Sequence, residues 1–246
     1  MNTSMSNDGS RERSRRMSRR AFISACGAGA VAAAGCVGSK EYPETDRAPE
    51  SVYADVDLPD DPAASEYPAA GDREAAVQVT YYGSWKCPVC AQFDVEYLSE
   101  FLTNYVNRRD VRLTYRNLSY AGGDAFLGRD APRTGTAGLS VWNNDPRSYW
   151  NFHGYVYANQ PPEDERWGTV DNLMNFVENS GVERRERIRT EVENGAYREL
   201  LRRSDENARE LGVAGTPAVV IDDRVTRNAM NYDSWTDEVD RMLSDG

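Results

Sequence analysis

Cys87 and Cys90 are the residues of this 246-residue chain whose type and spacing best suit a chemical step. They enclose Pro88 and Val89, and a disulfide across so short an offset closes a tight, strained loop that favours exchange. In such exchange a thiolate attacks the sulfur of a disulfide, and a second thiol resolves the mixed disulfide. The spacing therefore predicts a redox pair, with Cys87 as the exposed nucleophile and Cys90 as the resolving cysteine.

The flanking residues place this pair at the start of a helix. Residues 77–82 are β-branched and aromatic and predict a strand, which the loop containing Trp85 ends. Apolar residues then recur every four positions over 93–106, and Pro88 falls just inside the helix start, where its missing N–H costs nothing. A thiolate at a helix N-terminus faces unpaired N–H groups and the positive end of the helix dipole. The pKa of Cys87 should therefore fall.

Two other roles of the cysteine pair stay open. One is half of a zinc site, which needs two further Cys or His ligands, and His153 is the single histidine of the chain. The other is an inert structural disulfide. We expect no metal ion and no organic cofactor, and we interpret His153 as a partly buried structural residue. Lys86 is expected to add a little favourable charge beside Cys87.

Further elements lie downstream. Residues 111–116 alternate apolar and polar side chains, which predicts a strand with one buried face. Gly215-Thr216-Pro217 precedes an apolar run at 218–221, and a proline there indicates a strand start. Residues 234–243 predict a short amphipathic closing helix, and the glycines within 135–138 predict a loop.

Together these features resemble the thioredoxin superfamily, and its DsbA-like branch in particular, over residues 76–243. The cysteine motif at a strand-to-helix turn and the Thr216-Pro217 dipeptide carry the resemblance. It implies an α/β, thioredoxin-like fold with a helical insertion at about residues 119–205, including the aromatic stretch 149–160. It also implies that the Thr216–Pro217 bond is cis, packs against the disulfide and holds extended substrate chains, and that Trp85, Pro88 and Val89 form the active-site loop.

Val89 stands where the best-known DsbA-like proteins carry a histidine. By the resemblance, that histidine stabilises the thiolate and makes the disulfide strongly oxidising, so the direction of electron flow stays open here. Disulfide formation in exported proteins is the function we favour. The alternatives are a reductase or isomerase with reversed flow, and a non-catalytic peptide-binding lipoprotein on the same fold. An oxidase needs a membrane quinone-linked oxidant, and a reductase needs a thiol electron donor.

Residues 1–35 have the order of an export signal. A basic segment ends in Arg19 and Arg20 and precedes a short, weakly apolar stretch, which resembles the twin-arginine signal peptide. Cys36 follows small residues and is similar to the lipid-attachment cysteine of lipoproteins, although Ala33 departs from the usual Leu. A simply cleaved signal or an uncleaved anchor is the alternative. We expect a domain outside the cytoplasm, held by a lipid anchor at the outer face of the cell membrane.

The remaining composition bounds the domains and the partners. Residues 36–75 are acidic and rich in proline without apolar periodicity, which predicts a disordered tether before a folded domain at 76–246. The net charge is -11, and about -15 beyond the leader, whose six arginines outweigh two acidic residues. Such a surface repels nucleic acid and argues against binding it. Only two of the 29 basic residues are lysines, a composition typical of high-salt organisms or of a GC-rich coding bias.

Overall fold

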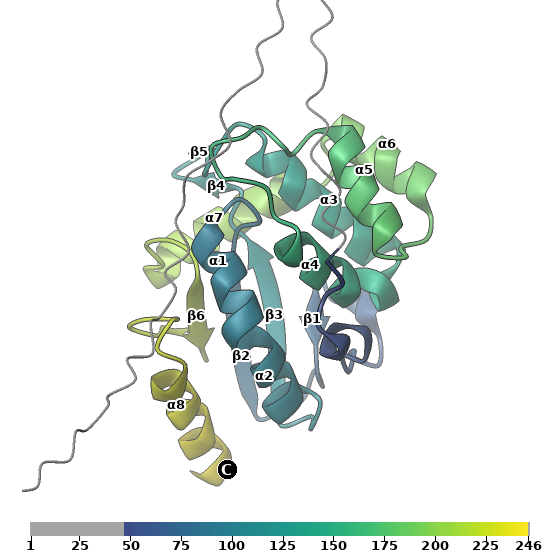
Figure 1. Ribbon diagram of the computed structural model, residues 1–246. Coiled ribbons are helices and arrows are strands. Elements are labelled where there is room, and N and C mark those ends of the chain that lie inside the picture. The colour runs from purple at the N-terminus through teal and green to yellow at the C-terminus, as the bar shows by residue number, and fades with distance from the viewer. Residues whose placement is uncertain (1–46, 246) are drawn as a thin grey trace, which may run out of the picture. The chain divides into compact units, whose positions relative to one another are not determined.

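A mixed five-stranded sheet forms the centre of the computed structural model, which describes residues 47–245 (Figure 1). The strand order is β1-β3-β2-β6-β7. The strands are β1 (Ala69–Ala70), β2 (Val77–Gly83), β3 (Val111–Asn117), β6 (Ala218–Ile221) and β7 (Arg224–Val225). β2 and β3 run parallel, and the other neighbouring pairs are antiparallel. The strands expected at 77–82, 111–116 and 218–221 are all present.

The carboxyl end of strand β2 is buried on both faces because its alternating side chains meet different helices. Tyr81 packs against Phe93 of the helix that follows, with ring centroids 4.7 Å apart. Tyr82 lies in a separate apolar cluster with Ala208 of α7 (Arg198–Leu211) and Val220 of β6. A strand covered on both faces is held firmly, so its carboxyl end presents the next residues, the cysteine loop, in a fixed position.

The helix after β2 spans residues 88–106 without a break, and Figure 1 shows it lying across the sheet. It consists of α1 (Pro88–Phe93), a π-helical segment (Asp94–Leu98), α2 (Ser99–Phe101) and a second π-helical segment (Leu102–Val106). The closing helix α8 (Tyr232–Asp245) packs beside it, and the Trp235 ring lies 4.9 Å from that of Phe101. Both predicted helices are therefore confirmed.

A helical insertion separates β3 from β6, as predicted, and Figure 1 shows most of its helices to one side of the sheet. It begins with the small hairpin β4 (Tyr120–Ala121) and β5 (Asp124–Ala125). Its helices are α3 (Ala131–Asn144), α4 (Tyr149–Ala158), α5 (Val170–Asn179) and α6 (Arg185–Asn194), and α7 leads back to the sheet.

The loop predicted at 135–138 is wrong, because these residues lie inside α3. Gly138 faces the indole of Trp85, and a Cβ built on Gly138 would lie 2.3 Å from Trp85 Cη2. The glycine thus serves close helix-to-indole packing, a requirement that the local sequence does not reveal.

The prediction of a disordered tether over the whole of 36–75 is also wrong, since the described chain from residue 47 packs on the domain. Tyr53 is buried and Ala69 and Ala70 are fully buried, and β1 pairs with β3 through Ala69↔Thr114. These few apolar anchors are too sparse to produce a periodic pattern, which is why composition suggested disorder. The folded domain therefore does not begin at residue 76 as expected, because it includes part of the proline-rich segment.

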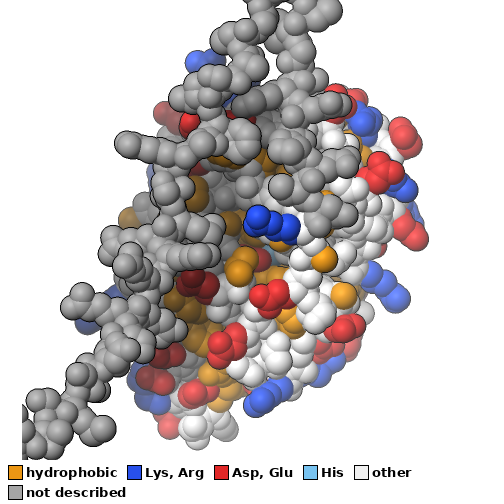
Figure 2. All heavy atoms as spheres, in the orientation of Figure 1, with side chains coloured by type: hydrophobic (Ala, Val, Ile, Leu, Met, Phe, Trp, Pro, Cys, Tyr) orange, Lys and Arg blue, Asp and Glu red, His pale blue; other side chains and the backbone are white. Residues whose placement is uncertain are grey.

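Residues 1–46 lie outside the described part, and with them the predicted signal residues Arg19 and Arg20 and the predicted lipid-attachment residue Cys36. None of the helices within residues 47–245 combines the length and apolarity needed to cross a bilayer. Figure 2 shows acidic and basic side chains interspersed on the face that carries α1 and α8. One arginine has several acidic neighbours: Arg109 pairs with Asp57, Asp60 and Asp72.

Candidate active site

The cysteine pair lies where β2 passes into α1. Cys87 is the N-cap residue, Pro88 is the first helical residue, and Cys90 follows one turn later with its N–H donating to the Cys87 carbonyl at 3.1 Å. Both thiols are free. Cys87 is 6% exposed and Cys90 is 0% exposed, so the nucleophile is more covered than expected, although it is the more accessible of the two. Val89, between them, is 45% exposed.

The two thiols have opposite electrostatic environments. A hydrogen bond from the Cys90 thiol is the largest cause that lowers the pKa of Cys87 from its usual 9.0 to about 6; burial opposes it, and Thr216 and the N–H groups of Cys90 and Val89 assist. Burial is the largest cause that raises the pKa of Cys90 well above its usual value, followed by the hydrogen bond and charge of Cys87. Near neutral pH the pair therefore combines a thiolate at Cys87 with a thiol at Cys90.

The Thr216-Pro217 loop lies beside the cysteine pair, because the strand that follows it, β6, is the neighbour of β2 in the sheet. The Thr216–Pro217 bond is cis, as the resemblance implied, and β6 begins at the next residue, Ala218, which pairs with Tyr82 of β2. That pairing brings the Thr216 carbonyl oxygen to 3.5 Å from Cys87 Sγ. A Cβ built on Gly215 would meet nothing within 4 Å, so the backbone before the loop has open space beside it.

Trp85 and Gln160 fix the cysteine loop to the insertion. Trp85 is fully buried, stacks on Tyr115 with ring centroids 6.2 Å apart, and meets Phe152 edge-on at 5.2 Å. The Gln160 amide donates to the carbonyl oxygens of Trp85 at 2.7 Å and Cys87 at 3.1 Å. Trp85 thus acts by packing, and Gln160, for which no individual role was predicted, holds the backbone of the cysteine loop in place.

Lys86 does not add charge at Cys87, contrary to expectation. Its side chain is 1% exposed and turns into the insertion, where Nζ lies 3.2 Å from Asp130 Oδ2 and 5.2 Å from the centre of the Trp167 ring. Asp130 also accepts a hydrogen bond from the Gly168 N–H at 2.8 Å. This buried pair joins the residue before the nucleophile to the start of α3, so its role is to hold two segments together.

A second buried polar cluster lies under α1. His153 Nε2 of α4 is 2.8 Å from Asp94 Oδ2, and the Tyr53 hydroxyl donates to Asp94 Oδ1 at 2.7 Å. Asp94 and His153 are almost completely buried, and the imidazole is packed among rings that include Tyr115 at 4.6 Å and Tyr157 at 5.0 Å. His153 is a structural residue, as interpreted, but fully rather than partly buried. One signal marked Asp94: it is a carboxylate four residues after Cys90 on the same helix.

Three tyrosines surround Cys90. The pKa values of Tyr81, Tyr115 and Tyr157 are all raised well above the usual value, by burial first and also by the charge of Cys90. The hydroxyls of Tyr115 and Tyr157 lie 3.1 Å apart. The three hydroxyls stay un-ionised, and burial in this uncharged environment keeps the Cys90 thiol protonated.

Metal ligands do not gather around the pair. Over residues 47–245 there is no group of three or more His, Cys, Asp and Glu side chains placed to hold an ion. His153, the one histidine available to a zinc site, is engaged with Asp94. The described part of the chain therefore offers the cysteines no partners for the half-zinc alternative.

Alkylation of the reduced chain should show the split between the two thiols directly. We expect Cys87 to react with iodoacetamide along a titration curve with a midpoint near pH 6, because its pKa is about 6 and only the thiolate reacts. Cys90 should stay unmodified throughout that range, since it is buried and its pKa is raised. Mass spectrometry of peptides after short pulses at each pH measures both; a midpoint near the usual 9.0 would contradict the assignment.

Comparison with known proteins agrees with this architecture. The family described as thioredoxin matches residues 64–241. Disulfide bond formation protein D of Bacillus subtilis is 22% identical over 182 residues, 74% of this chain and 79% of the relative. A probable disulfide bond formation protein D of Bacillus cereus is 28% identical, with 74% and 81% covered.

Solved structures show the same fold. Oxidised BdbD from Bacillus subtilis superposes with a TM-score of 0.66 at 22% identity, covering 73% of this chain and 94% of that one. Chlamydia trachomatis DsbA gives a TM-score of 0.60 at 17% identity, with 73% and 90% covered. The prediction of a thioredoxin-like fold with a helical insertion is confirmed, and the chain belongs to the thioredoxin family, with the fold of its DsbA-like members.

Proposed function

We propose that this protein is a thiol-disulfide oxidoreductase that forms disulfides in exported proteins, with Cys87 and Cys90 as its catalytic pair. The observation that carries the proposal is the pKa contrast within the pair: about 6 at Cys87, against a value raised well above the usual one at Cys90. A disulfide that only stabilises the fold does not require a stabilised thiolate at the N-terminus of a helix. The names of the Bacillus relatives, disulfide bond formation protein D, agree with this direction.

The chemistry begins with a disulfide between Cys87 and Cys90. A substrate thiolate attacks Cys87 Sγ, the Cys87–Cys90 bond breaks, and Cys90 leaves as a thiolate that takes up a proton. A second substrate thiolate attacks the substrate sulfur of the mixed disulfide, and Cys87 leaves as a thiolate. Two electrons pass from the substrate thiols to the enzyme. A membrane quinone-linked oxidant must then remove them to restore the disulfide.

The thiolate at Cys87 favours this direction. A thiol of pKa about 6 is about nine-tenths ionised at pH 7, which stabilises the reduced enzyme by about 1.4 kcal/mol over a thiol of pKa 9.0, or about 30 mV. Because the pKa is lowered, the stabilisation grows as the pH rises from 6 towards 9 and is lost as the pH falls below 6. A stabilised reduced form makes the disulfide a better oxidant, even with Val89 in place of a histidine.

Substrate would lie along the loop that precedes β6. Thr216 and Pro217 border Cys87, and the open backbone at Gly215 leaves room for an extended chain to pair by β-augmentation. The exposed Val89 offers an apolar contact beside the reacting sulfur. In this proposal Trp85, which is buried, shapes the loop without touching the substrate, and Pro88, which opens the helix, is exposed beside Val89.

The cellular setting in this proposal follows from the leader. Arg19 and Arg20 would direct export by the twin-arginine route, and a lipid on Cys36 would hold the domain at the outer face of the membrane, near a membrane oxidant. Residues 36–46 would then form a short tether, with folded structure from residue 47 onward.

The test is a stoichiometric exchange with the full chain. Oxidised protein mixed with a reduced peptide that carries two cysteines should convert one peptide per chain to its disulfide and should itself become reduced. Thiol trapping and mass spectrometry follow both partners. The converse mixture, reduced protein with oxidised peptide, should barely react. Efficient reduction of the peptide instead would reverse the proposed flow, and no exchange in either direction would leave only a peptide-binding role.

A further inference from the structure

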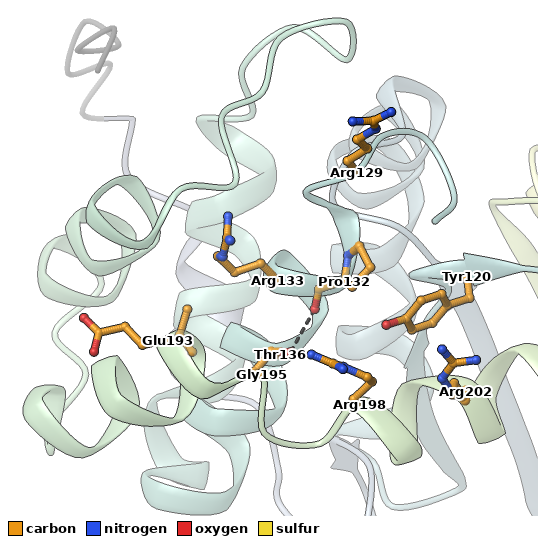
Figure 3. A pocket seen from close by; sticks show the side chains of 10 residues that line it. Tyr120, Arg129, Pro132, Arg133, Thr136, Glu193, Gly195, Arg198 and Arg202 are labelled. Carbon is orange, nitrogen blue, oxygen red and sulfur yellow. Dashed lines mark hydrogen bonds between the residues drawn. The ribbon is translucent and has the colours of Figure 1, made fainter. Parts of the chain in front are cut away.

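A cavity of about 310 Å³ in the insertion is lined by four arginines, Arg129, Arg133, Arg198 and Arg202, with Tyr120 at its wall and Glu193 as its one acidic lining residue (Figure 3). We refer to it as the arginine pocket. Its lining is strongly positive, whereas the whole chain carries a net charge of -11. A cavity of this volume has room for acidic side chains.

The fold brings the arginines together in two pairs. Arg198 and Arg202 are one turn apart on α7, and Arg129 and Arg133 bracket the start of α3. Gly195, in the turn before α7, leaves room for the Arg198 guanidinium: a Cβ built on Gly195 would lie 3.0 Å from Arg198 Nη2. Figure 3 shows Arg202 beside Tyr120 and Arg198 extending toward Gly195 and Thr136, and the Arg202 guanidinium lies 5.0 Å from the centre of the Tyr120 ring.

These charges are not neutralised within the described part of the chain. Arg129, Arg198 and Arg202 have no carboxylate within 4.0 Å there, and Arg133 donates to the Gly168 carbonyl oxygen. The Glu193 carboxylate points away from α7 in Figure 3. Its Oε1 lies 3.8 Å from Nη1 of Arg189, a residue that does not line the pocket. Like charges at four-residue spacing destabilise a helix by a few tenths of a kcal/mol. An anionic ligand would remove that cost.

The pocket adjoins the redox site through one buried ion pair. Asp130 lies between the pocket residues Arg129 and Pro132, and its carboxylate meets Lys86, the residue before Cys87. Gly128 also lies against the Lys86 side chain, since a Cβ there would be 3.5 Å from Lys86 Cε. The residue before Cys87 is therefore joined directly to the segment that carries Arg129 and Arg133.

We propose that the arginine pocket is an accessory site for acidic segments of the protein substrates, an inference that rests on the proposed function and deepens it. Guanidinium groups bind carboxylates through paired N–H donors. Four of them, spread over α7, α3 and the turn before α3, suit several carboxylates along a peptide better than one small anion. An acidic substrate is repelled by most of a surface with this net charge, so a local positive pocket steers it to the redox site.

The experiment compares two reduced two-cysteine peptides that differ only in flanking glutamates or glutamines, with the oxidised full chain at about 0.1 M salt. Wild type should oxidise the glutamate peptide with the higher second-order rate constant in a single turnover. The double variant Arg198→Gln/Arg202→Gln should lower that rate constant for the glutamate peptide by about fivefold, as expected for two exposed ion pairs, and leave the glutamine peptide within about twofold. At about 1 M salt, where the screening length is about 3 Å, the difference should vanish.

The matched control is Arg108→Gln/Arg147→Gln, which removes two exposed positive charges elsewhere. It should leave the preference between the peptides intact. Equal rates on both peptides, or equal effects of the two double variants, would overturn the inference while the proposed function stands. Loss of binding to anionic phospholipid vesicles by the pocket variant, with peptide rates unchanged, would also overturn it and assign the pocket to a membrane. Failure of both peptides to react would instead refute the proposed function.

Discussion

Replacing Cys87 with Ser should abolish peptide oxidation, with a loss of at least about a thousandfold in rate. Cys87 is the sulfur that a substrate reaches, because it is 6% exposed, lies 3.5 Å from the Thr216 carbonyl oxygen and has the lowered pKa. A hydroxyl in its place forms no mixed disulfide. Quenched-flow oxidation of a two-cysteine peptide measures the loss, and a near-normal rate would show that another residue carries the reaction.

The matched variant, Cys90→Ser, should behave differently. Cys87 would still react with an oxidised substrate and form a mixed disulfide, which would persist because no resolving thiol lies one turn behind it. A stable covalent adduct on non-reducing gels is the expected result. A Cys90→Ala variant, which removes this hydrogen-bond donor, should raise the pKa of Cys87, because the hydrogen bond from Cys90 is the largest cause of its lowering. Equal adduct formation by both single variants would contradict the division of roles.

Replacing His153 with Leu should lower the free energy of unfolding by about 3 kcal/mol. The change leaves the Asp94 carboxylate buried beneath the active-site helix, with the Tyr53 hydroxyl as its remaining side-chain hydrogen bond. An uncompensated buried charge is expensive, whereas the lost imidazole packing is largely replaced by leucine. Urea unfolding of the reduced full chain measures the effect.

The control for this prediction is the double variant Asp94→Leu/His153→Leu. Removing both partners eliminates the buried charge, so this protein should unfold with a higher free energy than His153→Leu alone. If the double variant were less stable than wild type by the full sum of the losses of the two single variants, Asp94 and His153 would not be energetically coupled. Their 2.8 Å contact would then contribute little.

The sequence was sufficient for the elements whose patterns are local. The strand at 77–82, the helix that follows Pro88 and the strand at 218–221 are regular, so periodicity locates them. The residues at the redox centre were also predictable, because Cys87, Cys90 and the Thr216-Pro217 dipeptide are distinctive in type and spacing. The structure brings these distant segments together through the pairing of Tyr82 with Ala218.

Features that depend on long-range packing were not predictable. Lys86 is adjacent to Cys87 in sequence, yet its charge is used 44 residues away, at Asp130. Residues 47–75 look like a linker by composition, but single anchors such as Tyr53 and Ala69 attach them to the core. The arginine pocket combines residues from β4, α3 and α7, and no stretch of sequence shows that these arginines face one cavity.

The reduction potential of the Cys87–Cys90 pair tests the central claim most directly. The full chain is equilibrated with glutathione redox buffers, and the fraction of free thiols is read by trapping. A disulfide-forming role predicts a potential above about -200 mV and towards the strong-oxidant level of about -120 mV, and the lowered pKa of Cys87 supplies about 30 mV of that shift. A value near about -270 mV, the level of a general reductant, would contradict a disulfide-forming role.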